Sequence, residues 1–292
     1  MSRSEEHKPF ELKDFFHENP LREIYSKGRG DGYFANAYID FSQDFETLRI
    51  SWRRIRQGCK DIGELDTRIR TIQSNEMRID DVALLHGLIN ILQSDIRAFV
   101  DIARTIMDKM TKLIEKLLGL SPGKGQKVSF TDHKKRLPVH HPNIHPTYLD
   151  FLQNRTYWYE QELLLLRDKV YAHGNTFITP WQVSLDGGIK IIKRSDFGGL
   201  EGKNKTVYLD IKNKYEKRYS NLKVTENDYV SLDEFLRQIR RLNIKLDEED
   251  VNKLRNIVSS FGIIIDEEFL ESIAKHLEEF MREIVAIFKD SI

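Results

Sequence analysis

The sequence predicts a mainly α-helical protein: a bundle with two long antiparallel helices, a small β-hairpin insertion and further helices near the C-terminus. Three observations lead to this prediction. Two long stretches repeat apolar residues every three or four positions, and a later stretch changes to a period of two. A sustained helical period is typical of bundles, in which each helix buries one apolar face.

The two long helices are predicted in succession after a polar N-terminal segment, residues 1–31. The first is expected from Tyr33, and the second is capped by Asp80 or Asp81, because carboxylates favour the positive end of a helix. The first apolar stripe is Phe34, Tyr38, Phe41, Phe45, Leu48, Trp52 and Ile55. The second is Leu85, Ile89, Leu92, Ile96, Phe99, Ala103, Ile106, Met110, Leu113 and Leu117. Nearly forty residues of helix would span about 55–60 Å.

Residues 119–146 interrupt this pattern and are expected to form a flexible basic loop. They contain Ser-Pro-Gly-Lys-Gly and His-His-Pro-Asn-Ile-His-Pro, and loops of this length are functional or disordered. Their basic residues, against Asp132 alone, are Lys124, Lys127, Lys134, Lys135 and Arg136. Helix is expected again from Thr147 to His173, with a bend. The bundle is therefore predicted to occupy residues 32–175.

The next segment, residues 176–223, is predicted to be a β-hairpin and strand insertion. Strands at Trp181-Gln-Val-Ser-Leu and Ile189-Lys-Ile-Ile-Lys flank the turn Asp-Gly-Gly, and Val207-Tyr-Leu-Asp-Ile is expected as a third strand. Residues 224–292 are predicted to be helical. A capping box of Ser231 and Glu234 opens one helix, and two more are expected at 247–261 and 266–289, the last packing with the bundle.

Composition excludes several classes of protein. The 292 residues balance 46 Lys and Arg against 46 Asp and Glu, and no apolar run approaches the roughly 20 residues that span a bilayer. The N-terminus has no apolar core of a secretory signal, and Cys59 is the only cysteine. We therefore expect a cytoplasmic protein without membrane segments or internal disulfides. Residues 119–146 and 187–223 are basic and 224–292 are acidic, which suits a polyanionic partner or a solvated surface.

One short segment carries chemistry: Arg167-Asp168-Lys169-Val-Tyr171-Ala-His173-Gly at the end of an apolar helix. The following glycine can end the helix in the left-handed conformation. The histidine then lies beside the free carbonyls of the last turn, where the helix dipole favours its protonated form. The alternative interpretation is a surface arginine and a helix-capping histidine in a structural bundle.

This segment resembles the signature of the HEPN superfamily, an arginine, a polar residue and a histidine after four to six spacers. HEPN domains are α-helical bundles with two long antiparallel helices, so the resemblance implies a HEPN-like bundle over residues 32–175. It implies catalytic roles for Arg167, His173 and Asp168 in a metal-independent RNase that needs no cofactor. In this family the 2′-hydroxyl of RNA attacks the adjacent phosphate. A histidine can move that proton, and a guanidinium can hold the phosphate oxygens.

The resemblance also implies partners and a biological setting. HEPN proteins are similar in acting as dimers in toxin–antitoxin or antiviral defence systems, so we expect RNA, a homodimer and an antitoxin protein. On an ideal helix Arg167 and His173 point about 120° apart, which favours a site composed from two chains. The apolar circumference of their helix also favours a dimer. Lys169, Tyr171, Lys134, Lys135 and Arg136 are the predicted RNA-binding residues. A non-catalytic dimer that binds RNA, nucleotide or protein is the alternative.

Two further features of the chain concern the regulation of such a protein and a possible metal site. Some HEPN toxins have a tyrosine two residues after the histidine, where this chain has Asn175. His140, His141 and His145 could ligate a metal, but they lack cysteines or acids at ligand spacing, so no metal site is predicted.

Overall fold

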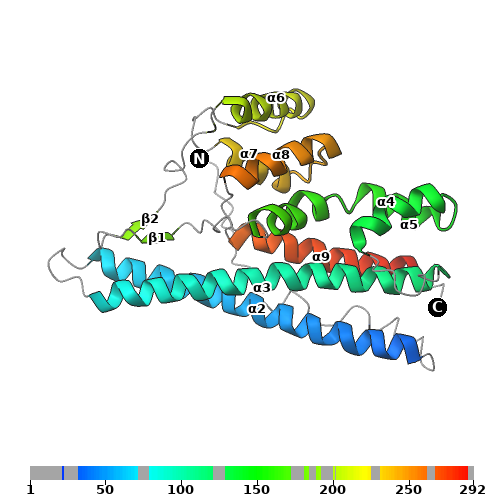
Figure 1. Ribbon diagram of the computed structural model, residues 1–292, viewed down its shortest axis with the longest axis horizontal. Helices are drawn as coiled ribbons and strands as arrows, with labels where there is room; N and C mark the ends of the chain where they lie inside the picture. Colours follow the sequence, from blue (N-terminus) through cyan, green and yellow to red (C-terminus); the bar gives the residue numbers. More distant parts are fainter. Residues whose placement is uncertain are drawn as a thin grey trace, which may run out of the picture.

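The computed structural model is mainly helical (Figure 1). It describes residues 22, 32–71, 79–120, 129–171, 181–183, 189–191, 200, 202–224, 231–261 and 267–288. No helix among these residues is both long and apolar enough to cross a membrane.

Helices α2 (Gly32–Thr71) and α3 (Ile79–Leu117) form the long antiparallel pair that the sequence predicts (Figure 1). Their apolar stripes are buried against each other, and the rings of Trp52 and Phe99 lie 5.6 Å apart. Arg54 Nη2 lies 3.0 Å from Oδ1 of the nearly buried Asp95, which joins the two helices at mid-length. Apolar burial and this ion pair together fix the register of the pair.

Three helices cover the second half of α3: α4 (Phe130–His140), α5 (Pro146–Asn154) and α9 (Glu267–Phe288). Figure 1 shows α9 lying along α3, with α4 and α5 beside it. Aromatic contacts join these helices. The ring of Phe280 on α9 lies 5.4 Å from that of Phe130 on α4, and the ring of Phe288 on α9 lies 5.5 Å from that of Tyr148 on α5. The C-terminal helix therefore packs directly on helices from the first half of the chain.

The helix that carries the Arg167 segment is broken from α5, and its hydrogen bonds follow the wider i→i+5 pattern of a π-helix, η1 (Tyr159–Tyr171). It packs against α3 and against α8 (Glu248–Phe261). Figure 1 shows α7 (Ser231–Arg241) beside α8, with α6 (Gly202–Arg218) above these two helices in this view. Lys214 ties α6 to the start of α8, with Nζ 2.6 Å from both Asp247 and Asp250.

Two short strands, β1 (Trp181–Val183) and β2 (Ile189–Ile191), pair antiparallel with Trp181 opposite Ile191. They lie in the two segments for which the sequence predicts a hairpin. The third strand predicted at residues 207–211 is wrong, because these residues belong to α6. Val, Tyr and Ile favour strands intrinsically, but Tyr208, Ile211 and Tyr215 repeat at helical spacing and are all buried.

The prediction of a flexible loop over residues 119–146 is also wrong for its second half. Residues 130–140 form α4, with Ser129 as N-cap, and Phe130 and Leu137 are buried. The prolines and histidines of this segment are typical of a loop, but Phe130 and Leu137 are seven residues apart and therefore lie on one face of a short helix. Pro138 lies in the last turn of this helix and removes one N–H donor, and the helix ends two residues later at His140.

Candidate functional site

The Arg167 segment is placed only in part. Arg167, Asp168, Lys169 and Tyr171 belong to the last turns of η1, but their side chains lie outside the described residues. His173 and the glycine after it also lie outside the described residues. The predicted catalytic and RNA-binding roles in this segment therefore stay predictions.

The first half of η1 is held firmly in the core. Trp158, Tyr159, Leu163, Leu164 and Leu165 are buried, and the ring of Tyr159 meets that of Phe130 edge-on at 4.7 Å. Burial raises the pKa of Tyr159 to about 12, so its hydroxyl stays protonated. The apolar side chains in this described part of the helix are covered within one chain. They therefore do not support the dimer that the apolar circumference of the helix led us to expect from the sequence.

Polar side chains fix η1 to the connection between α7 and α8 and to α9. The side-chain amide of Gln161 donates to the Ile244 carbonyl at 3.2 Å and accepts from the Leu246 N–H at 2.7 Å, which satisfies both ends of a buried group. The buried Glu162 accepts a hydrogen bond of 3.0 Å from Ser272 on α9. These contacts hold the helix that leads to Arg167 in a single orientation.

The three predicted RNA-binding cations outside this segment lie on α4, and each has a carboxylate nearby. Lys134 Nζ is 2.6 Å from Glu160 Oε2 and 3.1 Å from the Thr156 carbonyl, and burial lowers its pKa. The exposed Lys135 lies 3.8 Å from Glu248. Lys134 is thus used to join α4 to the start of η1, and the free positive charge of this region is smaller than the sequence suggests.

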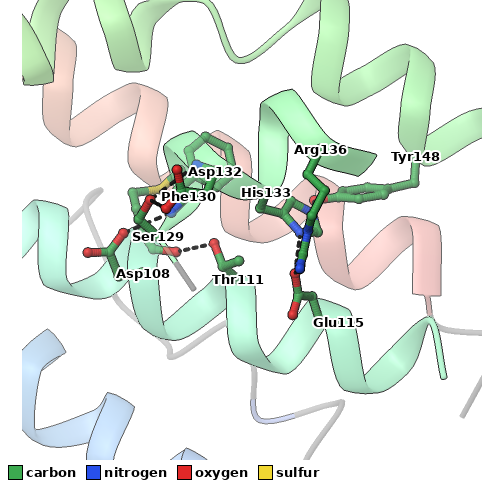
Figure 2. Close-up of polar contacts among 10 residues, drawn as sticks. Asp108, Thr111, Glu115, Ser129, Phe130, Asp132, His133, Arg136 and Tyr148 are labelled. Atoms are coloured by element: carbon green, nitrogen blue, oxygen red, sulfur yellow. Dashed lines mark hydrogen bonds and ion pairs between the residues drawn. The ribbon is translucent and has the colours of Figure 1, made fainter. Parts of the chain in front are cut away.

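A buried polar cluster lies where α3, α4 and α5 meet, and the sequence analysis missed it (Figure 2). His133 is fully buried, with Nδ1 3.0 Å from Glu115 Oε1 and Nε2 2.9 Å from the Tyr148 hydroxyl. Arg136 Nη2 donates to the same Oε1 atom at 2.6 Å. Figure 2 shows Arg136 and His133 approaching Glu115 from one side. The signal in the sequence was the spacing of Phe130, His133 and Leu137 on one helix face.

A neutral His133 satisfies both of its own ring nitrogens, whereas Glu115 Oε2 is buried and has no hydrogen-bond partner among the described residues. The Nδ1–H of His133 donates to the Glu115 carboxylate, and its Nε2 accepts from Tyr148. Burial is the largest influence and lowers the pKa of His133, although the nearby Glu115 opposes this. Burial also raises the pKa of Tyr148 well above its usual value. Glu115, His133 and Tyr148 are enclosed by the core, and only Arg136 reaches solvent, so we interpret the cluster as a structural hydrogen-bond network.

The lowered pKa of His133 predicts a pH-dependent stability. The unfolded chain binds a proton at this histidine near pH 6.5, whereas the folded chain binds it only at lower pH. The contribution of His133 to the free energy of unfolding should therefore be fully present above about pH 6.5. It should be lost as the pH falls through the pKa of His133 in the folded state. Urea titrations of the wild type and of His133→Gln at several pH values measure this.

The diagnostic quantity is the difference in stability between the wild type and His133→Gln. It should be constant above about pH 7 and shrink towards pH 5, since only the wild type loses stability through this group. His86→Gln is the matched control, because His86 is exposed on α3. A difference that is independent of pH would show that His133 titrates alike in the folded and unfolded chains.

The loop histidines act in local structure. His145 is the N-cap of α5, where Nδ1 accepts from the Tyr148 N–H at 3.3 Å, and its ring lies 5.2 Å from that of Phe288. Within the described part of the chain, no three His, Cys, Asp or Glu side chains are grouped so that they could hold a metal ion.

Comparisons with protein-family models, with curated proteins and with solved structures find no match to this chain.

Proposed function

We propose that this chain is a HEPN-like protein that acts on RNA, as a metal-independent endoribonuclease of toxin or phage-defence type in the cytoplasm. The observation that carries the proposal is the position of Arg167 and Asp168. They lie in the last turns of helix η1, which follows the two long antiparallel helices in the chain and whose first half is buried in the core.

The proposed reaction uses three residues of the motif. His173 accepts the proton of a ribose 2′-hydroxyl, whose oxygen attacks the adjacent phosphorus. The bond from phosphorus to the 5′-oxygen breaks, the proton taken up by His173 is passed through solvent to this oxygen, and the products are a 2′,3′-cyclic phosphate and a 5′-hydroxyl. Arg167 would hold the negative phosphate oxygens through its two-donor fork, and Asp168 would orient it.

Arg167 and His173 are six residues apart, which on an ideal helix turns them about 120° away from each other. The proposal therefore includes either an unwound helix end near Ala172 or a homodimer that places two motifs across one groove. In a toxin system, an antitoxin protein would cover this groove.

Cleavage of single-stranded RNA in the presence of EDTA tests the proposed function. We expect products that end in a 2′,3′-cyclic phosphate, detected by mass spectrometry. A DNA of the same sequence should stay intact because it has no 2′-hydroxyl. Activity that appears only with a divalent metal ion would contradict the proposal.

A non-catalytic HEPN-like dimer that binds RNA, nucleotide or a partner protein is the second candidate. The ion pairs of Lys134 and Lys135 with Glu160 and Glu248 favour its nucleotide- or protein-binding form, since they reduce the charge available for holding a long RNA. Binding without cleavage across diverse RNAs, together with a dimer in light scattering, would support this candidate. A monomer at micromolar concentration would remove the composite site.

A further inference from the structure

The N-terminal half of α3 has an apolar face that is open to solvent. Leu84 and Ile91 on this face are 51% and 52% exposed, and they are seven residues apart, which places them on the same side of the helix. Leu88 lies between them and is half-buried. The chain has no Asp, Glu, Lys or Arg between Asp81 and Asp95. An exposed apolar and uncharged helix face of this kind is typical of a surface that binds another protein surface.

The same face contains a glycine that the packing of the chain does not require. Gly87 lies inside α3, where glycine weakens a helix relative to alanine. A Cβ atom at this position would meet no other atom within 4 Å, so no contact within the chain excludes a side chain here. A glycine on an open helix face lets a second helix approach closely.

The two ends of this face have opposite charges. At one end, Arg54 of α2 binds Asp95 through Nη2 and Nε at 3.0 and 3.1 Å, and the Arg54 side chain is 60% exposed. Its Nη1 group has N–H donors that this ion pair does not use. At the other end, Asp80 is exposed, and no residue in the described part of the chain forms an ion pair with it. A partner with the same two ends in reverse order would be complementary.

We propose that a second copy of this chain covers the face, with its α3 antiparallel to the first about a twofold axis. An axis at the level of the peptide between Gly87 and Leu88 places Leu84 of each copy opposite Ile91 of the other. It also places the glycine of each copy opposite the leucine of the other, so that a large side chain faces the position without one. The uncharged face lets the two identical surfaces meet without like-charge repulsion.

The charged ends select the same axis. With this axis, Asp80 of each copy lies at the level of Asp95 of the other, and therefore beside the Arg54 guanidinium that binds Asp95. Each Arg54 can then donate to two carboxylates, one from each copy. A parallel pair would place Arg54 beside its own copy, which repulsion disfavours. The apolar contacts and the ion pairs thus agree on one antiparallel register.

This surface is distinct from the Arg167 segment, so the inference goes beyond the proposed function. Arg104 interacts with Tyr159 of η1, and Arg104 and Leu84 lie about 160° apart around α3. The α3 pairing therefore does not bring the two η1 helices together. Self-association is measured without RNA, so its outcome and that of the cleavage assay are independent.

Light scattering of the full chain at tens of micromolar tests the proposal, and we expect the mass of a dimer. Leu84→Glu should weaken the dimer by at least about a hundredfold and give a monomer, because two carboxylates would be buried in an apolar interface. Val139→Glu is the matched control and should stay dimeric, since Val139 is 73% exposed on α4. Circular dichroism verifies that both variants fold. A monomeric wild type, or a dimer that Leu84→Glu leaves intact, would overturn the proposal.

Cysteine cross-linking in a Cys59→Ala background, which removes the only native cysteine, tests the register. The double variant Leu84→Cys/Ile91→Cys should form an interchain disulfide on oxidation, because the two positions face each other across the axis. Each single variant should cross-link at least about tenfold less. A residue and its own copy would lie about 10 Å apart along the helices, beyond the reach of a disulfide. Single variants that cross-link as readily as the double variant, or a double variant that does not cross-link, would contradict the antiparallel pairing.

Discussion

Replacing His173 with alanine is expected to reduce RNA cleavage by about 10²- to 10⁴-fold, the usual contribution of a general base. RNA binding should change little, because the phosphate contacts come from other side chains. The measurement is the rate of single-stranded RNA cleavage in EDTA, with binding followed by fluorescence anisotropy. His86→Ala is the matched control, since this exposed histidine on α3 belongs to no site described above.

Arg167→Lys is expected to lose most of the activity as well. The ammonium keeps the positive charge but not the planar pair of donors that holds two phosphate oxygens at once. An electrostatic role alone would be rescued by lysine, so the variant separates charge from geometry. Cleavage that survives His173→Ala would refute the catalytic assignment and leave the binding scaffold as the better explanation.

The long elements were predictable because their pattern is long. The stripe from Leu85 to Leu117 repeats through many turns, and α3 runs from Ile79 to Leu117. Helices α8 and α9 likewise begin and end within one residue of the bounds expected from their apolar periodicity and acidic first turns. Over such lengths, an apolar pattern with the helical period of 3.6 residues rarely arises by chance.

Short elements were harder because local preference and tertiary packing disagree there. Val207 to Ile211 has strand-forming residues, yet Tyr208 and Tyr215 bury their rings against Phe235 on α7, and this packing selects the helix. In α4 the apolar face has only a few residues. Its proline and charged residues therefore predicted a loop from the sequence.

The spacing on α4 indicates that His133 faces the core, but its partners Glu115 and Tyr148 could not be predicted from the sequence. Each residue type is ordinarily exposed or half-exposed, and the partners are separated by 15 and 18 positions. Only the packing of α4 and α5 on α3 brings them together. The Arg167 segment illustrates the opposite case, because its motif is visible in the sequence while its side-chain geometry lies outside the described residues.

Phe130→Ala is expected to be the most destabilising single substitution proposed here, with a loss of about 3–5 kcal/mol in the free energy of unfolding. Phe130 is fully buried, and its ring lies edge-on to Tyr159 of η1 at 4.7 Å and to Phe280 of α9 at 5.4 Å. Its backbone N–H donates to Asp108 of α3 at 2.9 Å. The side chain thus joins three helices, α4, η1 and α9, and its removal leaves a cavity between them, whereas the backbone hydrogen bond to α3 is kept in the variant.

Urea denaturation of the wild type and Phe130→Ala measures this loss as a lower midpoint with an unchanged slope. Val139→Ala is the matched control on the same helix, because Val139 is 73% exposed and its truncation should cost less than about 0.5 kcal/mol. A loss below about 1 kcal/mol for Phe130→Ala would mean that α4 does not hold η1 against the core. The orientation of η1, and with it the placement of Arg167 at its far end, depends on that contact.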